Sequence, residues 1–277
     1  GKFETGYSGA ATETEAQKNT IEVDKVIVKP NVYSWRSIQV ANAFTVSYNY
    51  KRDLESHMMK NTEWGAVAYL SHSIYGINGE VRINNYSQYK TGYAAVNEPT
   101  LEYPDYKCYG TDSSLTLPYN TATGYLASTT GNITGIYDMS GGSTEYVMGV
   151  MKDINGNLMS GYTIYGNSGF NGILYDGSNF ISGINFPSNK YYDIYNYYNN
   201  RFGYFGRILG DATGEIGSFY SSVSSWYNDD SWFVDSLYSW FVRGAVLSYG
   251  TRAGIFAFAS FTGNFASTLT FRIVFAI

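Results

Sequence analysis

The side chains that most often do chemistry in proteins are sparse in this chain. His57 and His72 are the only histidines and lie 15 residues apart with no third ligand in the pattern, so we expect polar helix-end residues rather than a metal site. The single cysteine, Cys108, excludes an internal disulfide and any multi-cysteine metal site, and we expect it to be a half-buried small residue. No Ser-His-Asp arrangement, phosphate-binding loop or dinucleotide-binding fingerprint occurs. The sequence therefore predicts no catalytic residue, no metal and no cofactor.

The carboxylates are the remaining candidates for chemistry. Asp138 and Glu145 fall on a segment expected to be buried, where their role is to accept hydrogen bonds from backbone N–H groups. Residues 153–157 look like a calcium loop but lack the downstream glutamate, so an ordinary hairpin turn is predicted there. Three aspartates beside Trp226 and Trp232 have no spacing that suits acid–base catalysis: Asp229, Asp230 and Asp235.

Contact chemistry is concentrated in the last stretch of the chain, from Ser239 to Ile277. Blocks of residues that look architectural alternate there with blocks that follow neither a period of two nor one of three to four. The irregular blocks mix Leu, Phe and Val with Ser, Thr and Arg beside glycines, where loops and strand ends are expected. A packed core needs a period, and a solvated loop does not need Leu and Phe, so we predict a ligand-binding surface. Its residues are Val246, Leu247, Ser248, Tyr249, Arg252, Ala259, Ser260, Phe261, Phe265, Ser267, Thr268 and Leu269.

The architectural residues of this stretch carry a family resemblance: Trp240, Arg243-Gly244, Ala253-Gly254, Phe256 and Phe271-Arg272. Their pattern resembles the C-terminal variable region of proteins, of gut-bacterial or phage type, that diversity-generating retroelements diversify. Those proteins are similar to the formylglycine-generating-enzyme (sulfatase-modifying-factor-like) branch of the C-type lectin fold. The resemblance implies a variable ligand-binding region at about 240–277, and the twelve irregular positions are expected to be mostly exposed in one patch. The intervening Trp240, Ile255, Phe256, Phe258 and Phe271 are expected to be buried.

The composition of the tail agrees with such diversification. In the family, a template-directed process rewrites adenines, mostly in Asn codons, and changes to the first two bases of those codons cannot yield Lys, Glu, Gln, Met or Trp. None of these five types occurs from Ala245 to Ile277. At their density in residues 1–244, about 5 would be expected there.

A second segment carries the same resemblance. The lectin-like fold has a core motif of the form Asn-x-x-Gly-x-Tyr-Asp-Met-x-Gly-Asn-x-x-Glu-Trp. This chain reads Asn132, Gly135, Tyr137-Asp138-Met139, Gly141-Gly142 and Glu145-Tyr146. It departs from the motif at Gly142, which replaces Asn, and at Tyr146, which replaces Trp. We expect a tight turn at the two glycines and a strand that begins at Glu145.

The fold class expected is α+β, a C-type lectin fold with two helices packed on antiparallel sheets and long Gly/Tyr-rich loops. One helix is predicted after Ser37 as its cap, with Ile38, Val40, Ala41 and Phe44 at helical spacing. The other is predicted from Asn61 as its N-cap, with Glu63 in the first turn and an apolar face at Trp64, Val67, Ala68 and Leu70. The start Thr62-Glu63-Trp64 resembles a helix of the same family.

The domain division expected is an N-terminal extension over 1–30 and a lectin-like domain over 31–277. The first twenty residues are polar and look like a linker or a poorly packed extension. The extension holds a candidate first strand, Val26–Val28, which we expect to lie beside the last strand, Arg272–Ile277. Because the chain begins abruptly at Gly1, we expect a display segment to precede it.

Composition limits the partners. The net charge is −5 and charged residues are only 15% of the chain, which argues against nucleic acid or an anionic membrane as the main partner. No run of eighteen apolar residues is present, so no membrane span is predicted. With 29 Tyr and 30 Gly, the chain has the chemistry of exposed contact surfaces. We expect an extracellular, cell-surface or virion-surface protein that binds a variable protein or glycan on another cell or virus, as phage receptor-binding proteins do.

Two alternatives remain open. A carbohydrate-binding lectin is one, with a platform made by Tyr191, Tyr192, Tyr195, Tyr197 and Tyr198, although packing under a long loop is the simpler role of these rings. A formylglycine-generating-type enzyme is the other. That chemistry, as the family implies, needs a pair of cysteines near the C-terminus, and none follows Cys108.

Overall fold

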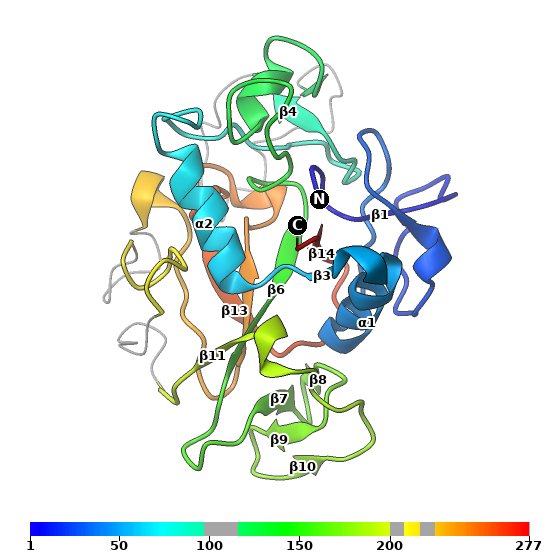
Figure 1. Ribbon diagram of the computed structural model, residues 1–277, viewed down its shortest axis with the longest axis vertical. Coiled ribbons are helices and arrows are strands. Elements are labelled where there is room, and N and C mark those ends of the chain that lie inside the picture. Colours follow the sequence, from blue (N-terminus) through cyan, green and yellow to red (C-terminus); the bar gives the residue numbers. More distant parts are fainter. Residues whose placement is uncertain (97–115, 200–207, 217–224, 277) are drawn as a thin grey trace.

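The computed structural model describes residues 1–96, 116–199, 208–216 and 225–276. The expectation for Cys108 falls outside these ranges, as does Ile277. Within them the chain is a mixed α+β structure (Figure 1), as predicted. The helices are α1 (Val40–Tyr50) and α2 (Asn61–Ser71), and the strands are β1 (Gly6–Tyr7), β2 (Val26–Ile27), β3 (His57–Met58), β4 (Tyr93–Ala95), β5 (Thr116–Pro118), β6 (Thr144–Met151), β7 (Met159–Tyr162), β8 (Gly166–Asn167), β9 (Gly172–Leu174), β10 (Asn179–Phe180), β11 (Asp193–Tyr195), β12 (Trp240–Arg243), β13 (Phe258–Phe261), β14 (Leu269–Phe271) and β15 (Ile273–Val274).

The longest strand, β6, lies at the centre of the largest sheet. The strand order is β11-β6-β12-β13, and β14 pairs with the start of β6 on the side opposite β12. β12 runs antiparallel to both β6 and β13, as expected. β11 and β14 run parallel to β6, so the expectation of antiparallel sheets is wrong for these two pairs. Long connections separate both strands from β6 in the sequence, and such connections permit the parallel direction that a hairpin forbids.

Alternate residues of β6 point into two hydrophobic cores. Tyr146, Met148 and Val150 belong to the core that contains the apolar residues of α1, whereas Val147 and Met151 belong to the core that contains those of α2. Because successive side chains of a strand point to opposite faces, the two cores lie on the two faces of the sheet. Figure 1 shows the two helices on either side of β6. All eight residues of this strand are buried.

Helix α1 forms where the apolar spacing predicted it but begins later. Its N-cap is Gln39, and its first residue is Val40. Ser37 has a φ of 58°, so the predicted cap lies outside the helix. The backbone N–H of Val40 donates to the carbonyl of Gly263 at 3.2 Å, which fixes the start of α1 against the C-terminal segment.

Helix α2 begins at Asn61, and its N-cap is Lys60, one residue before the predicted cap. Glu63 lies in the first turn as predicted, and its Oε2 accepts a hydrogen bond from the backbone N–H of Lys60 at 2.8 Å. Such a contact satisfies one of the unpaired donors at a helix N-terminus. Trp64 is buried, but Leu70 is 58% exposed, so its predicted place on the apolar face is wrong. The buried residues of the helix are Asn61, Trp64, Gly65, Ala68 and Ser71.

The first residues of the chain pack into the body of the molecule. Phe3, Glu4 and Thr5 are buried, and the N–H of Thr5 donates to the carbonyl of Phe271 at 3.1 Å. The two ends of the described chain lie close together in Figure 1, because the backbone nitrogen of Gly1 bonds the carbonyl of Ile273. The expectation of a poorly packed extension is therefore wrong for residues 3–5. Phe3 packs on Tyr119 and Tyr137, and Glu4 accepts a hydrogen bond from Ser34.

The expected first strand is present as β2, but its partner differs from the prediction. β2 pairs with β1, and the C-terminal strand β15 pairs with β3. The expectation that Val26–Val28 and the last strand would be neighbours is therefore wrong. The strand that precedes α2 occupies the position beside β15.

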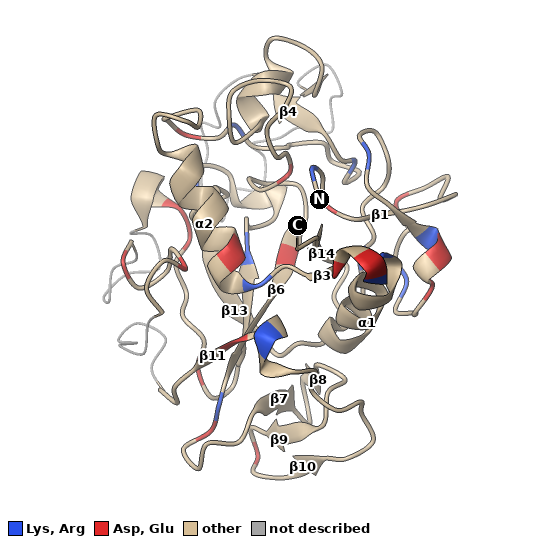
Figure 2. Ribbon diagram, viewed as in Figure 1, with Lys and Arg blue, Asp and Glu red and all other residues tan. Residues whose placement is uncertain are grey.

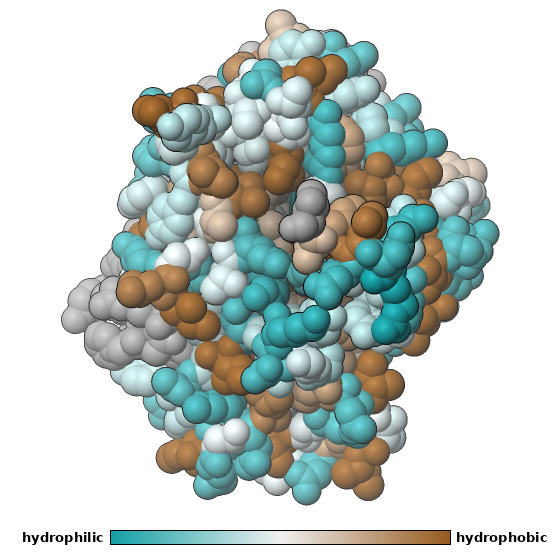
Figure 3. All heavy atoms as spheres, in the orientation of Figure 1, coloured by the Kyte–Doolittle hydropathy of each residue, from teal (hydrophilic) through white to brown (hydrophobic). Residues whose placement is uncertain are grey.

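A small four-stranded sheet of order β10-β9-β7-β8 forms a lobe below the main body in Figure 1. Figure 3 shows hydrophobic atoms on this lobe and also beside the C-terminal end of α2. The most exposed apolar side chains there are Ile154, Ile164 and Ile181 near the lobe and Ile74 and Tyr75 after α2. Within the described ranges, no helix combines the length and the apolar character needed to cross a bilayer.

Candidate ligand-binding groove

Three strands of the C-terminal segment lie in one sheet around β6. Val242 of β12 is opposite Tyr146 of β6 and Ala259 of β13. Leu269 of β14 is opposite Thr144 of β6. Because residues opposite each other in a sheet share a face, and Thr144 and Tyr146 are two residues apart, these side chains point to the same side of the sheet.

A groove of about 160 Å³ opens over this face. It is smaller than the roughly 300–1,000 Å³ of most small-molecule sites, so its size suits one side chain or a small group better than a cofactor. Most of its lining is apolar or aromatic. We call it the C-terminal groove, and its lining residues are Thr144, Asp230, Val242, Ala245, Val246, Tyr249, Phe258, Ala259, Ser260, Phe261, Thr268 and Leu269.

The structure brings many of the predicted ligand-binding residues together in this groove. Those that line it are Val246, Tyr249, Ala259, Ser260, Phe261, Thr268 and Leu269. Those that do not are Leu247, Ser248, Arg252, Phe265 and Ser267. The residues in the groove come from three different elements, which the sequence could not show to be adjacent.

The exposure of the twelve predicted positions differs from the expectation. Only Phe265 and Ser267 are exposed, and four are buried: Val246, Leu247, Arg252 and Leu269. Leu269 packs into the core on the α1 side, and Val246 and Leu247 pack against Ala253 and Ala257. The prediction of exposure is therefore wrong for these four. The half-buried lining residues are called the five groove positions: Tyr249, Ala259, Ser260, Phe261 and Thr268.

The residues expected to hold the loops in place are buried. Trp240, Ile255, Phe256, Phe258 and Phe271 are each no more than 2% exposed, which confirms that prediction. The ring of Trp240 stacks on Phe186 and Phe170 with centroids 5.9 Å apart in both cases. These contacts fix the strand behind the groove independently of the residues that line it.

Position 254 requires glycine because the side chain of Asp229 lies against its backbone. A Cβ at this position would lie 2.0 Å from an oxygen of Asp229. The other contact of Asp229 is at Phe256, whose backbone N–H donates to its Oδ2 at 2.9 Å. Burial, reinforced by nearby Glu80, raises the pKa of Asp229 well above its ordinary value. This aspartate therefore acts as a structural acceptor for the loop between the groove strands.

Asp230 is the charged residue of the groove that sequence reasoning missed. Segment 230–232 runs along the outer edge of β13, where the N–H of Phe258 donates to the carbonyl of Asp230 at 2.9 Å. Its Oδ1 accepts hydrogen bonds at 2.9 Å from Arg252 Nη2 and from Trp232 Nε1. Asp230 and Arg252 are 22 residues apart, so no local spacing indicated the pair.

The titration of Asp230 gives a testable pH dependence. Burial raises the pKa of Asp230 from 3.8 to about 6, although Arg252 and Trp232 oppose the shift. Between these two pKa values the folded state binds the proton more tightly than the unfolded chain does. The free energy of unfolding therefore falls by at most about 3 kcal/mol as pH rises from about 4 to about 6, and it stays level above that. Urea unfolding at pH 4 and pH 7 measures this loss. In Asp230→Asn, we expect the free energies of unfolding at pH 4 and pH 7 to differ without this contribution. If the two values differ by the same amount in the wild type and in the variant, Asp230 is not the group that titrates.

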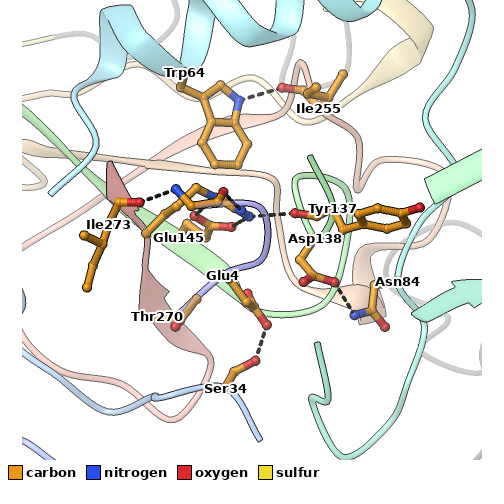
Figure 4. A network of polar contacts seen from close by, with 12 residues as sticks. Glu4, Ser34, Trp64, Asn84, Tyr137, Asp138, Glu145, Ile255, Thr270 and Ile273 are labelled. Carbon is orange, nitrogen blue, oxygen red and sulfur yellow. Dashed lines mark hydrogen bonds and ion pairs between the residues drawn. The ribbon is translucent and has the colours of Figure 1, made fainter. Parts of the chain in front are cut away.

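A second set of polar groups anchors the C-terminal strands from behind the groove. Arg272 is fully enclosed, and its guanidinium binds both oxygens of Glu145, with Nε to Oε2 at 3.0 Å. Its Nη2 also donates to the carbonyl of Tyr137 at 2.9 Å, and its Nη1 to that of Gly1 at 3.1 Å (Figure 4). The red segment of β6 in Figure 2 corresponds to Glu145, the acidic residue of that strand. Arg272 thus joins the last strands to β6 and to the first residue.

The two carboxylates of the core motif have different roles. Asp138 accepts hydrogen bonds from the N–H of Gly92 at 2.8 Å and from Asn84 Nδ2 at 2.9 Å, so its predicted role as an acceptor for backbone N–H groups is confirmed. Glu145 instead forms the ion pair with Arg272, so the same prediction is wrong there. The strand that starts at Thr144 and the positive φ of Gly141 and Gly142 agree with the expected turn and strand.

The tyrosines considered as a sugar platform are packed. Tyr195 is buried, and its hydroxyl donates to Asp211 Oδ2 at 2.6 Å. Tyr191 and Tyr192 pack against the core on the α1 side, and Tyr197 and Tyr198 against the core on the α2 side. Rings held in this way offer little free face for stacking on a sugar.

His72 is the C-cap of helix α2, as expected for a helix-end residue, whereas His57 lies in strand β3, so the expectation is wrong for it. His57 Nε2 is 2.9 Å from Glu63, and His72 Nδ1 is 2.8 Å from the hydroxyl of Tyr227. Among the described residues, no group of three or more His, Cys, Asp or Glu side chains is arranged to hold a metal ion. The C-terminal groove offers a ligand apolar walls, hydroxyl groups and the carboxylate of Asp230. No protein-family model matches the chain, and a search of curated proteins finds no match to it.

Proposed function

We propose that this protein is a non-enzymatic binding protein whose C-terminal groove receives an apolar side chain of a partner protein. The observation that carries the proposal is the gathering of seven predicted contact residues in one groove: Val246, Tyr249, Ala259, Ser260, Phe261, Thr268 and Leu269. Aromatic anchors in a concave, largely apolar site are typical of the residues that dominate binding energy. In this reading, Tyr249 and Phe261 are the anchors.

The chemistry of the lining favours a protein partner over a glycan. The apolar floor is made by Val242, Ala259 and Leu269, and the one charged group, Asp230, is already paired with Arg252. A glycan needs several hydrogen-bonding groups for its hydroxyls, and without them its polar groups would lose their bonds to water. An apolar side chain loses nothing of this kind on entering the groove and gains from leaving water.

The class of protein that we favour is a variable protein of a diversity-generating retroelement with a C-type lectin fold, displayed on a cell or virion surface. Support comes from the separation of the C-terminal segment into a buried frame and a half-buried lining. Trp240 and Phe271 are inaccessible to solvent, whereas the five groove positions are not. A rigid frame with freedom of residue identity on one face is what a diversified site requires. The adjacent ends of the chain and the helices that flank β6 are compatible with the fold.

The test uses a displayed random-peptide library as the probe. Peptides selected on the wild-type protein are expected to share an apolar residue and to bind at least about tenfold more weakly to Tyr249→Ser and Phe261→Ser, since truncation of an anchor costs about 2 kcal/mol or more. Tyr165→Ser and Tyr175→Ser are the matched controls, because both rings are exposed on the β7–β10 lobe. The melting temperature of each variant is measured alongside.

Two results would count against this function. If the selected peptides bind the groove variants and the lobe variants equally well, the groove is not the contact site. If a glycan array gives binding that Phe261→Ser abolishes while the peptides give none, the partner is a carbohydrate and the lectin alternative takes its place.

A further inference from the structure

One lining residue of the C-terminal groove, Asp230, belongs to a buried ion pair whose other member, Arg252, lies behind the lining. Asp230 lines the groove, and its carboxylate binds Arg252 Nη2 at 2.9 Å. The side chains are 2% and 10% exposed respectively. Opposite charges in contact present little net charge to a neighbouring group, so the groove in this chain suits an uncharged ligand.

The two members of the pair occupy different parts of the sequence. Arg252 is one of the irregular C-terminal positions expected to vary, whereas Asp230 precedes that segment. Loss of the guanidinium would leave the carboxylate of Asp230 beside the groove without this cation. A buried charge that has lost its partner is strongly unfavourable, and a ligand of opposite charge relieves that cost.

We infer that the residue at position 252 selects the charge of the ligand and that Asp230 is the fixed group against which it acts. Arg252 neutralises Asp230 and favours an uncharged apolar group. A neutral residue at 252 favours a cation, such as a Lys or Arg side chain of the partner. The inference rests on the proposed function, because it takes the groove as the ligand site.

Three probes of the same shape test this selection: benzamide is neutral, benzamidinium is a cation and benzoate is an anion. Binding is followed by NMR titration at pH 8, above the pKa of about 6 that Asp230 has beside Arg252. The wild-type protein is expected to prefer benzamide. Arg252→Ser is expected to bind benzamidinium about tenfold more tightly than benzamide, and Asp230→Asn to favour benzoate by a similar factor, as charge attraction at a partly buried site predicts.

Two controls isolate the effect. The double variant Arg252→Ser/Asp230→Asn is expected to return the preference to benzamide. Lys190→Ser removes the cation of an exposed pair with Glu55, 3.8 Å apart, and is expected to leave every preference unchanged. If Arg252→Ser fails to fold, the benzoate preference of Asp230→Asn decides the question.

The titrations distinguish a wrong inference about charge selection from a wrong proposal about the groove. Equal preferences in the wild type and in both folded single variants would overturn charge selection while leaving binding in the groove intact. If none of the three compounds shifts the resonances of the groove in any variant, both the inference and the groove as a ligand site are overturned.

Discussion

Arg272→Met is expected to lower the free energy of unfolding by about 3–5 kcal/mol, because it breaks a buried ion pair and leaves one charge without its partner. Glu145 and Arg272 are each 1% exposed. Burial lowers the pKa of the Arg272 guanidinium, but the negative charge of Glu145 raises it by more, so this pKa lies above its ordinary value. The substitution also removes the hydrogen bonds to the carbonyls of Tyr137 and Gly1. Urea unfolding at pH 7 measures the loss.

The matched control for this substitution is Arg52→Met, since Arg52 is exposed and its guanidinium contacts only the helix surface at Tyr48 and Asn49. Its expected effect is within about 0.5 kcal/mol. The double variant Arg272→Met/Glu145→Met is expected to be more stable than Arg272→Met alone, because it leaves no unpaired carboxylate on β6. A loss of under about 1 kcal/mol for Arg272→Met would show that the pair does not anchor the C-terminal strands.

The second large effect separates the twelve predicted contact positions into two groups. Leu269→Ala is expected to cost about 2–5 kcal/mol, as truncations in a packed core do. Its side chain is 3% exposed and belongs to the core on the α1 side. Ser267→Ala, two residues earlier on an exposed turn, is expected to change stability by no more than about 0.5 kcal/mol. Thermal unfolding of the two variants under one set of conditions measures the difference.

This difference bears directly on function. If Leu269→Ala and Ser267→Ala have the same small effect, Leu269 is as free to vary as the exposed residues, and the buried part of the groove is not a fixed floor. If the expected difference is found, Leu269 belongs to a fixed floor, and variation without loss of folding is expected at the five groove positions, at position 252 and at exposed neighbours such as Phe265.

The frame of this protein was predictable from its sequence, whereas the exposure of its contact residues was not. Trp240 and Phe271 were predicted to be buried because they belong to the architectural pattern that carries the family resemblance, and they are buried. Leu269 follows no period within its own segment, because its environment is set by pairing with Thr144 on a strand far away in the sequence. Periodicity reports only on neighbours along the chain.

The charged contacts show the same limit. Asp230 was noted only as an aspartate beside a tryptophan, and its partner Arg252 was assigned to an exposed surface. The ion pair depends on how segment 230–232 lies along β13, which no local pattern encodes. The polar N-terminal residues also gave no signal of burial, since the groups that satisfy Glu4, such as the hydroxyl of Ser34, come from elsewhere in the chain. The two helices, by contrast, were visible because their contacts repeat at helical spacing.

The central claim is that residue identity is free to vary in the C-terminal groove and fixed in the frame around it. The most direct test is to sequence the 3′ end of the gene and its flanking DNA across the population in which the gene occurs. We expect a near-copy of that end, differing mainly at adenines, beside a reverse transcriptase gene. Amino-acid replacements should concentrate at the five groove positions and at position 252, and should spare Trp240, Arg243 and Arg272. Replacements no more frequent in the groove than in the β7–β10 lobe, with no near-copy beside the gene, would contradict the account.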